Sequence, residues 1–180
     1  MPWYAVLLRA VNLGGDTTLE MASLRAALER AGFGGVNTYL QSGNVVLDAK
    51  DPQSADVERR IEQVLDRTFG LRTDAMARTA EEWRVVVRNN PFADAARADP
   101  SHLTVLSLKA PVPASAWTAL ENAISGREET RGSGRQGYVY YPDGIGRSRL
   151  TLDRIERALG GHGTLRNWNT VLKLDAALRR

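Results

Sequence analysis

The stretch VNTYLQSGNVVLDA, residues 36–49, contains two short β-rich runs on either side of a small polar turn. The runs are Val36–Gln41 and Asn44–Ala49, and Ser42-Gly43 separates them. A glycine at this point can supply the positive φ angle that a tight hairpin needs. The stretch therefore predicts two strands that pair antiparallel.

The residues before this hairpin predict a strand followed by a helix. The unbroken apolar run Ala5–Leu8 is typical of a buried strand. Thr17 and Glu20 form a capping box, which predicts a helix that ends at Gly32.

The residues after the hairpin repeat this alternation. A helix is predicted to begin at Asp51-Pro52 and to end at Gly70, and a weaker strand follows over residues 72–78. Thr79 and Glu82 make a second capping box, which opens another short helix. The order of elements is βαββαβ, the split βαβ arrangement of ferredoxin-like folds.

A second set of elements follows the stretch between Pro91 and Pro100. Its predicted strands and helices are His102–Lys109 (strand), Ala114–Ser125 (helix), residues 127–131 (weak strand), Tyr138–Tyr141 (strand), Ser148–Leu159 (helix) and Trp168–Leu178 (helix).

These patterns predict an α+β protein in which two ferredoxin-like halves of βαββαβ type carry mainly antiparallel sheets. The halves share element order without sharing sequence, which indicates a topological duplication. We place the first half at residues 1–90, a connector at 91–100, and the second half with its terminal helix at 101–180.

The composition excludes several classes of chemistry. The chain has 180 residues and no cysteine, so disulfides, cysteine-based zinc sites, iron–sulfur clusters and thiol nucleophiles are ruled out. His102 and His162 are the only histidines, and neither has a partner at metal-ligand spacing, so we expect no metal and no cofactor. No catalytic motif identifies the chain as an enzyme, and that question stays open. Short apolar runs and an N-terminus unlike a signal peptide predict a cytoplasmic protein with no membrane partner.

The charge is concentrated near the C-terminus. Lys and Arg number 24 against 21 Asp and Glu, for a net charge of +3, but residues 131–180 alone carry 10 basic and 4 acidic side chains, a net of +6. This excess favours either an ordinary solvated basic face or an anion-binding surface.

Two loops of the first half carry candidate ligand-binding residues. One follows the first strand and leads through paired glycines to a helix start, where backbone N–H groups can hold an anion. The other is the hairpin tip, where amide and hydroxyl groups either recognise a polar ligand or bond their own backbone. The residues are Arg9, Asn12, Gly14 and Gly15 in the first loop, and Gln41, Ser42 and Asn44 in the second.

Two further candidate segments lie in the second half. In the first, tyrosines on one sheet face precede a glycine-led helix start with arginines, an arrangement that suits either base stacking with phosphate contact or a partly buried sheet. The second is a polar segment entering the terminal helix, where Asn167 serves either as a ligand contact or as the N-cap. The residues are Tyr138, Tyr140, Arg147, Ser148 and Arg149 in the first, and Arg166, Asn167 and Asn169 in the second.

Five sequence blocks together carry a family resemblance: LLRAVNLGG (7–15), YLQSGNVV (39–46), NPF (90–92), YPDGIGRSRLT (141–151) and RNWNTV (166–171). In this order the chain resembles the family called domain of unknown function 1697. The resemblance implies a bacterial-type cytosolic α+β protein with ferredoxin-like halves and implies no established activity. Family members often carry a basic residue shortly after the paired glycines, where this chain has DTTL (16–19).

The leading functional hypothesis is a protein that binds a phosphorylated ligand, either nucleic acid or a nucleotide-like small molecule. The alternatives are an enzyme that acts on a small polar substrate in a cleft between the halves, and a structural or oligomer-forming module. Because the candidate residues lie at strand ends and helix starts, we also expect them to gather in one site.

Overall fold

The computed structural model describes residues 1–13 and 18–179. The chain divides into two compact units, of which unit 1 is Met1–Val85 with Leu174–Arg180, and unit 2 is Val86–Lys173. The predicted glycine pair Gly14-Gly15 and the capping residue Thr17 lie outside the described residues. No helix in the described part of the chain is both long enough and apolar enough to cross a membrane.

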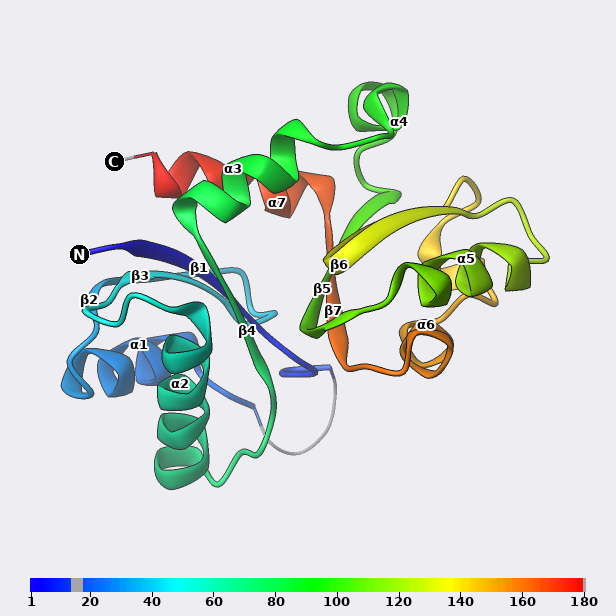
Figure 1. The fold of residues 1–180 in the computed structure, drawn as a ribbon. Coiled ribbons are helices and arrows are strands. Elements are labelled where there is room, and N and C mark those ends of the chain that lie inside the picture. The colour runs from blue at the N-terminus through cyan, green and yellow to red at the C-terminus, as the bar shows by residue number, and fades with distance from the viewer. Residues whose placement is uncertain (14–17, 180) are drawn as a thin grey trace. The chain divides into compact units, whose positions relative to one another are not determined.

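Unit 1 contains a four-stranded antiparallel sheet with two helices on one face (Figure 1). The strand order is β2-β3-β1-β4, and the order of elements along the chain is the predicted βαββαβ. The elements are β1 (Trp3–Leu8), α1 (Met21–Arg30), β2 (Gly34–Tyr39), β3 (Asn44–Asp48), α2 (Ser54–Phe69) and β4 (Ala75–Thr79), after which α3 (Ala80–Arg88) begins.

The predicted hairpin is confirmed. β2 and β3 pair antiparallel with Tyr39 opposite Asn44, and Gly43 has a φ of 74° in the turn between them. Alternate residues of β1 and β3 pack against the apolar faces of α1 and α2, and these contacts form the core of unit 1. The second helix ends as expected at Gly70, which has a φ of 63°.

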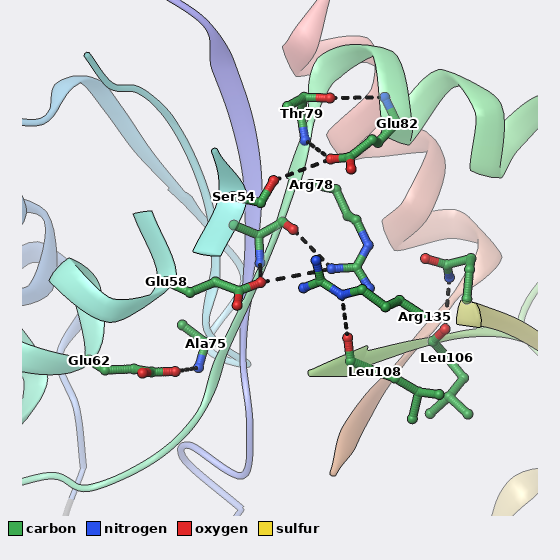
Figure 2. Close-up of polar contacts among 12 residues, drawn as sticks. Ser54, Glu58, Glu62, Ala75, Arg78, Thr79, Glu82, Leu106, Leu108 and Arg135 are labelled. Atoms are coloured by element: carbon green, nitrogen blue, oxygen red, sulfur yellow. Dashed lines mark hydrogen bonds and ion pairs between the residues drawn. The ribbon is translucent and has the colours of Figure 1, made fainter. Parts of the chain in front are cut away.

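β4 is an edge strand of the sheet, and carboxylates of α2 accept hydrogen bonds from the backbone N–H groups on its outer edge. The N–H group of Ala75 donates to Oε1 of Glu62 at 2.9 Å, and the N–H group of Ala77 donates to Oε1 of Glu58 at 2.8 Å (Figure 2). These bonds occupy donors that an open strand edge would otherwise present to another chain.

Of the two predicted capping boxes of this half, that of Thr79 and Glu82 lies wholly within the described residues. Thr79 and Glu82 form theirs at the start of α3: the N–H group of Glu82 donates to Thr79 Oγ1 at 3.1 Å, and the N–H group of Thr79 donates to the Glu82 carboxylate at 2.7 Å (Figure 2). At α1 the N-cap position is Glu20, with no side-chain cap bond.

Unit 2 contains a three-stranded antiparallel sheet in the order β6-β5-β7. Helices α5 and α6 cover one of its faces and enclose a core that includes Trp117, Val139 and Ile155 (Figure 1). The elements are α4 (Ala93–Ala98), β5 (Leu103–Val112), α5 (Ala114–Ala123), β6 (Glu129–Tyr140), the 3-10 turn η1 (Ile145–Arg147), α6 (Leu152–Leu159) and β7 (Gly163–Asn167), and α7 (Trp168–Leu178) begins here and ends in unit 1.

The α+β class with two antiparallel sheets is confirmed, but the element order of the second half differs from the prediction. One long strand, β6, replaces the two separate strands expected at residues 127–131 and 138–141. At Gly132 and Gly137 a Cβ would collide with the ring of Trp117, so both glycines make room for that side chain within the strand. Gly134 has a φ of 57°, and the pairing of β6 with β5 shifts register beside it. β7 was not predicted, and α4 lies in the stretch expected to be a connector.

Candidate functional site

Asn12 connects three parts of unit 1. Its amide nitrogen donates to the carbonyl oxygens of Leu19 at 2.9 Å and Gln41 at 2.7 Å, and its side-chain oxygen accepts the N–H of Leu19 at 2.7 Å. The residue has a φ of 55°, in the left-handed region that asparagine tolerates better than most residues. Asn12 therefore joins the end of β1 to the hairpin tip.

The hairpin side chains are also used inside the turn. Asn44 is fully buried, and its amide nitrogen donates to the Tyr39 carbonyl and to Ser42 Oγ, both at 2.9 Å. At Arg9 the backbone carbonyl accepts a hydrogen bond from the Thr73 hydroxyl. These polar groups hold the loops in place.

The two tyrosines of β6 lie in different surroundings. Tyr138 is 7% exposed and its hydroxyl donates to the carbonyl of Val86 at 2.6 Å, and burial raises the pKa of this tyrosine to about 12. It has no free ring face to stack on a base, and its burial agrees with the alternative of a partly buried sheet face. Tyr140 is partly exposed, donates to the Asp99 carboxylate at 3.1 Å and has its ring centroid 6.3 Å from that of Phe92.

Arg166 lies on the opposite face of the unit 2 sheet from α5 and α6. Leu165 and its register partner Leu106 face α5 and α6, so the next residue, Arg166, faces the opposite side. Its guanidinium donates to Thr164 Oγ1 at 2.7 Å and to the Leu165 carbonyl at 2.8 Å, and burial lowers its pKa to about 10.

Asn167 is the N-cap of α7, as the capping alternative predicted. Its side-chain oxygen accepts the N–H of Thr170 at 3.0 Å. Asn169 lies exposed in the first turn of that helix.

The loop between β6 and α6 is held at several points. The hydroxyl of Tyr141, a fully buried residue, donates to the Leu150 carbonyl at 3.0 Å. Ser148 Oγ donates to Oε1 of Glu128 and accepts the N–H of Leu150 at 2.9 Å. These bonds hold the intervening arginines in a defined loop.

The start of α6 corrects another prediction. The helix begins at Leu152 with Thr151 as its N-cap, whose hydroxyl accepts the N–H of Arg154 at 3.3 Å. Ser148 is extended and bonded within the loop, so it does not start the helix. Arg147 and Arg149 consequently lie in the loop before α6 and not in its first turn.

This loop borders a groove between α5 and α6 with a volume of about 380 Å³. Apolar residues of both helices form part of its wall, and the loop supplies charged groups. We call this the α5–α6 groove; its lining is Leu120, Ala123, Ile124, Ser125, Gly126, Glu128, Arg147, Arg149, Leu150, Arg154 and Ala158.

The groove arginines differ from their neighbours in electrostatic pairing. In the described part of the chain no carboxylate forms an ion pair with Arg147, Arg149 or Arg154. The arginines next to them are paired: Arg127 with Asp143 at 2.7 Å, and Arg157 with Asp153. The lining thus carries three unpaired positive charges and one negative charge, that of Glu128.

A second groove, of about 360 Å³, lies between α1 and α2 in unit 1. Arg60 from its lining pairs with Asp51, donates to the Ala31 carbonyl at 2.8 Å and lies 4.2 Å from the centre of the Phe33 ring. Two further arginines of this lining, Arg30 and Arg67, have no carboxylate partner among the described residues. The α5–α6 groove has three such arginines and a loop fixed by hydrogen bonds, so it is the stronger candidate site.

The structure brings together part of the predicted site. Arg147 and Arg149 line one groove, and Ser148 is bonded to Glu128 in its wall. Arg154 and Glu128 join them without having been predicted. The threonine that caps α6 could have indicated the position of Arg154, whereas the place of Glu128 depends on tertiary packing. The convergence of unit 1 and unit 2 residues in a single site stays a prediction.

The fold and the groove define an α+β protein of two antiparallel-sheet units, one of which carries a basic groove. The chain belongs to the family described as "Protein of unknown function (DUF1697)", which matches residues 1–138. No curated protein matches the chain.

Solved structures give a likeness of fold. One, described as the structure of conserved bacterial protein SP0830 from Streptococcus pneumoniae, has a TM-score of 0.77 at 20% identity and covers 100% of this chain and 99% of that chain. It has the same fold. Another, described as the crystal structure of putative chlorite dismutase TA0507, has a TM-score of 0.27 at 10% identity and covers 97% of this chain and 99% of that chain. This similarity is too low to indicate a shared fold.

Proposed function

We propose that unit 2 binds a small molecule bearing a phosphate group in the α5–α6 groove. The observation that carries the proposal is the set of three arginines, Arg147, Arg149 and Arg154, that line one groove without a carboxylate partner among the described residues. Arginine forks match the geometry of phosphate oxygens and remain charged at every physiological pH.

The charge balance of the groove supports a phosphate monoester. Three arginines against the single carboxylate of Glu128 leave an excess of two positive charges. A phosphate monoester carries about −1.5 to −2 charges near neutral pH, so it compensates this excess. The bonds that Tyr141 and Ser148 make to Leu150 hold the loop before binding, which lowers the entropic cost of ordering it.

The groove favours a small ligand over nucleic acid. Its volume of about 380 Å³ falls within the ordinary range of small-molecule sites. Stacking residues and a long track of arginines would favour a polymer. Tyr138 is buried, however, and Arg166 faces the other side of the sheet.

The test is calorimetric titration of the whole protein with inorganic phosphate and with single-stranded RNA. Replacing Arg147, Arg149 or Arg154 by alanine removes charge-assisted hydrogen bonds, so each should weaken phosphate binding by roughly ten- to a hundredfold. Arg157→Ala is the matched control, because Arg157 lies on α6 with Arg154 but is paired with Asp153. It should leave affinity unchanged.

The salt dependence of the affinity distinguishes RNA from a small phosphate ligand. An RNA held by many phosphate contacts loses affinity steeply between about 50 and 200 mM salt, whereas a single phosphate group responds far less. The proposal fails if phosphate shows no saturable binding at the lower salt, or if the three groove variants behave like Arg157→Ala. Tight, steeply salt-dependent RNA binding that the groove variants abolish would replace it with the nucleic-acid hypothesis.

A further inference from the structure

Glu128 is a carboxylate in the wall of a groove that otherwise carries positive charge. Its Oε1 accepts a hydrogen bond from Ser148 Oγ. Its Oε2 lies beside Gly126, so close to where a Cβ would stand that a side chain at position 126 would require this carboxylate to move. The hydrogen bond from Ser148 therefore holds the Glu128 carboxylate in the wall of the groove.

No cation neutralises this carboxylate within residues 1–13 and 18–179. A negative charge beside a phosphate site weakens phosphate binding by repulsion. An ionised carboxylate has two oxygens with about four acceptor positions, and Ser148 uses one of them. No other group of the described residues donates to this carboxylate, so the remaining positions are open to donor groups of a ligand or to water.

We infer that the ligand of the α5–α6 groove is a sugar phosphate, whose hydroxyl groups donate to Glu128 while its phosphate contacts the arginines. This inference rests on the proposed function. A carboxylate beside a phosphate site is a known way to hold sugar hydroxyls, as acidic residues do for ribose in dinucleotide-binding folds. The apolar side chains of Leu120, Ile124 and Ala158 suit the carbon–hydrogen face of a sugar ring.

A hydroxyl donor fits this position better than an ammonium group. An ammonium would also pair with Glu128, but it would enter a groove that holds three unpaired guanidinium groups and would be repelled by them. A neutral hydroxyl donates to the carboxylate without that repulsion. The chemistry therefore selects a phosphorylated polyol over a phosphorylated amine.

The experiment compares inorganic phosphate, ribose 5-phosphate and phosphoethanolamine by calorimetric titration of the whole protein. Ribose 5-phosphate should bind the wild-type protein about tenfold more tightly than phosphate, because its hydroxyls add hydrogen bonds to a charged acceptor. Phosphoethanolamine should show no such gain. A comparison of the affinities of AMP and ribose 5-phosphate then shows which ligand the groove prefers. Tighter binding of AMP indicates a nucleotide, and tighter binding of ribose 5-phosphate indicates a simple sugar phosphate.

Variants at Glu128 test the assignment. Glu128→Ala removes the repulsive charge and the acceptor, so phosphate affinity should rise while the preference for ribose 5-phosphate disappears. Glu128→Gln keeps an acceptor for Ser148 and hence the loop, but replaces the other oxygen with a donor, so the preference should disappear there too. Glu129→Ala is the control, since Glu129 is the adjacent, exposed glutamate and does not line the groove.

The outcomes separate the two proposals. If the wild-type protein does not bind phosphate, the proposed function itself fails. If it binds phosphate but binds ribose 5-phosphate no more tightly, or if the preference survives both Glu128 variants, only the sugar-phosphate inference is overturned. Tighter binding of phosphoethanolamine than of ribose 5-phosphate also overturns it.

Discussion

The hydroxyl of Tyr138 lies inside unit 2 and donates to the Val86 carbonyl. Burial raises the pKa of Tyr138 to about 12, whereas an unfolded tyrosine titrates near 10. The folded protein therefore keeps this proton at pH values at which the unfolded chain has lost it. The resulting stability is fully present below about pH 10 and is lost as the pH rises toward 12.

We expect Tyr138→Phe to reduce the alkaline loss of stability. In the wild-type protein, ionisation of this residue in the unfolded state should lower the free energy of unfolding by roughly 2–3 kcal/mol across that interval. The variant lacks this contribution, although the unsatisfied Val86 carbonyl costs it about 1 kcal/mol at neutral pH. Urea unfolding at several pH values from neutral to strongly alkaline measures both effects. Equal alkaline losses in the two proteins would contradict the prediction.

The residue type of Asn12 indicated a polar role for this side chain, but the sequence left open whether it contacts a ligand or the backbone. An asparagine after a strand predicts either a ligand contact or a turn residue that bonds the backbone. The structure gives its side chain three hydrogen bonds to Leu19 and Gln41, which lie 7 and 29 residues away in the sequence. Local propensity does not reveal partners at such separations.

At the scale of elements, the sequence predicted unit 1 best, because its boundaries are marked by local chemistry. The capping box of Thr79 and Glu82 starts α3, and Gly43 and Gly70 have the positive φ angles expected of them. Such signals involve residues within a few positions of one another, so they can be read without knowing the tertiary structure.

In unit 2 the same signals were misread where packing decides the structure. Gly132 and Gly137 are typical of a loop, yet they belong to β6 because Trp117 packs against them. Ser148 is a common helix N-cap, but its hydroxyl is bonded to Glu128, and Thr151 caps the helix instead. In both places the deciding partner is distant in sequence.

The residues of the candidate site likewise fall into those that local sequence identifies and those that tertiary packing places. Arg147 and Arg149 could be singled out because glycines and a polar run surround them in one segment. Arg154 follows them in the first turn of α6, whereas Glu128 lies in the loop after α5, and only the packing of α5 against α6 places that carboxylate in the same groove. A sequence pattern can identify one side of such a groove, but not the opposing wall.

Two turn glycines allow the cost of a positive φ angle to be separated from the cost of crowding. At Gly70, with a φ of 63°, an added Cβ meets nothing within 4 Å. At Gly43, with a φ of 74°, it would lie 2.5 Å from Cγ2 of Val11 and 2.8 Å from Cβ of Leu8. The first position needs glycine for its backbone alone, and the second also needs it for space.

We therefore expect Gly70→Ala to lower the free energy of unfolding by about 1–2 kcal/mol, the cost of a left-handed alanine. Gly43→Ala should cost roughly 1–3 kcal/mol more, because β1 and the hairpin must shift to admit the methyl group. Urea denaturation of the two variants side by side gives the difference. Equal losses would mean that the hairpin accommodates the methyl group without strain.

At the scale of the whole molecule, the chain leaves unit 1 and returns to it. Unit 1 combines Met1–Val85 with Leu174–Arg180, and unit 2 is the continuous segment between them. Helix α7 starts in one unit and ends in the other. Unit 1 thus lacks this segment until residues 174–180 have been synthesised, whereas all of unit 2 precedes them in the chain.

This arrangement makes the end of α7 a test of the division into units. Leu174 is fully buried, whereas Leu172, on the same helix, is 42% exposed. Leu174→Ala should lower the free energy of unfolding by about 2–5 kcal/mol through the cavity it leaves. Leu172→Ala is the matched control and should change stability by less than about 0.5 kcal/mol.

Hydrogen exchange locates the effect of Leu174→Ala within the chain. Because Leu174 belongs to unit 1, amides of the β1–β4 sheet should exchange faster in this variant, and those of β5 and β6 should change less. Faster exchange confined to residues 86–173 would assign the end of α7 to unit 2. An equal rise in both sheets would show that the two units open together, in which case the C-terminal segment stabilises the molecule as one cooperative structure.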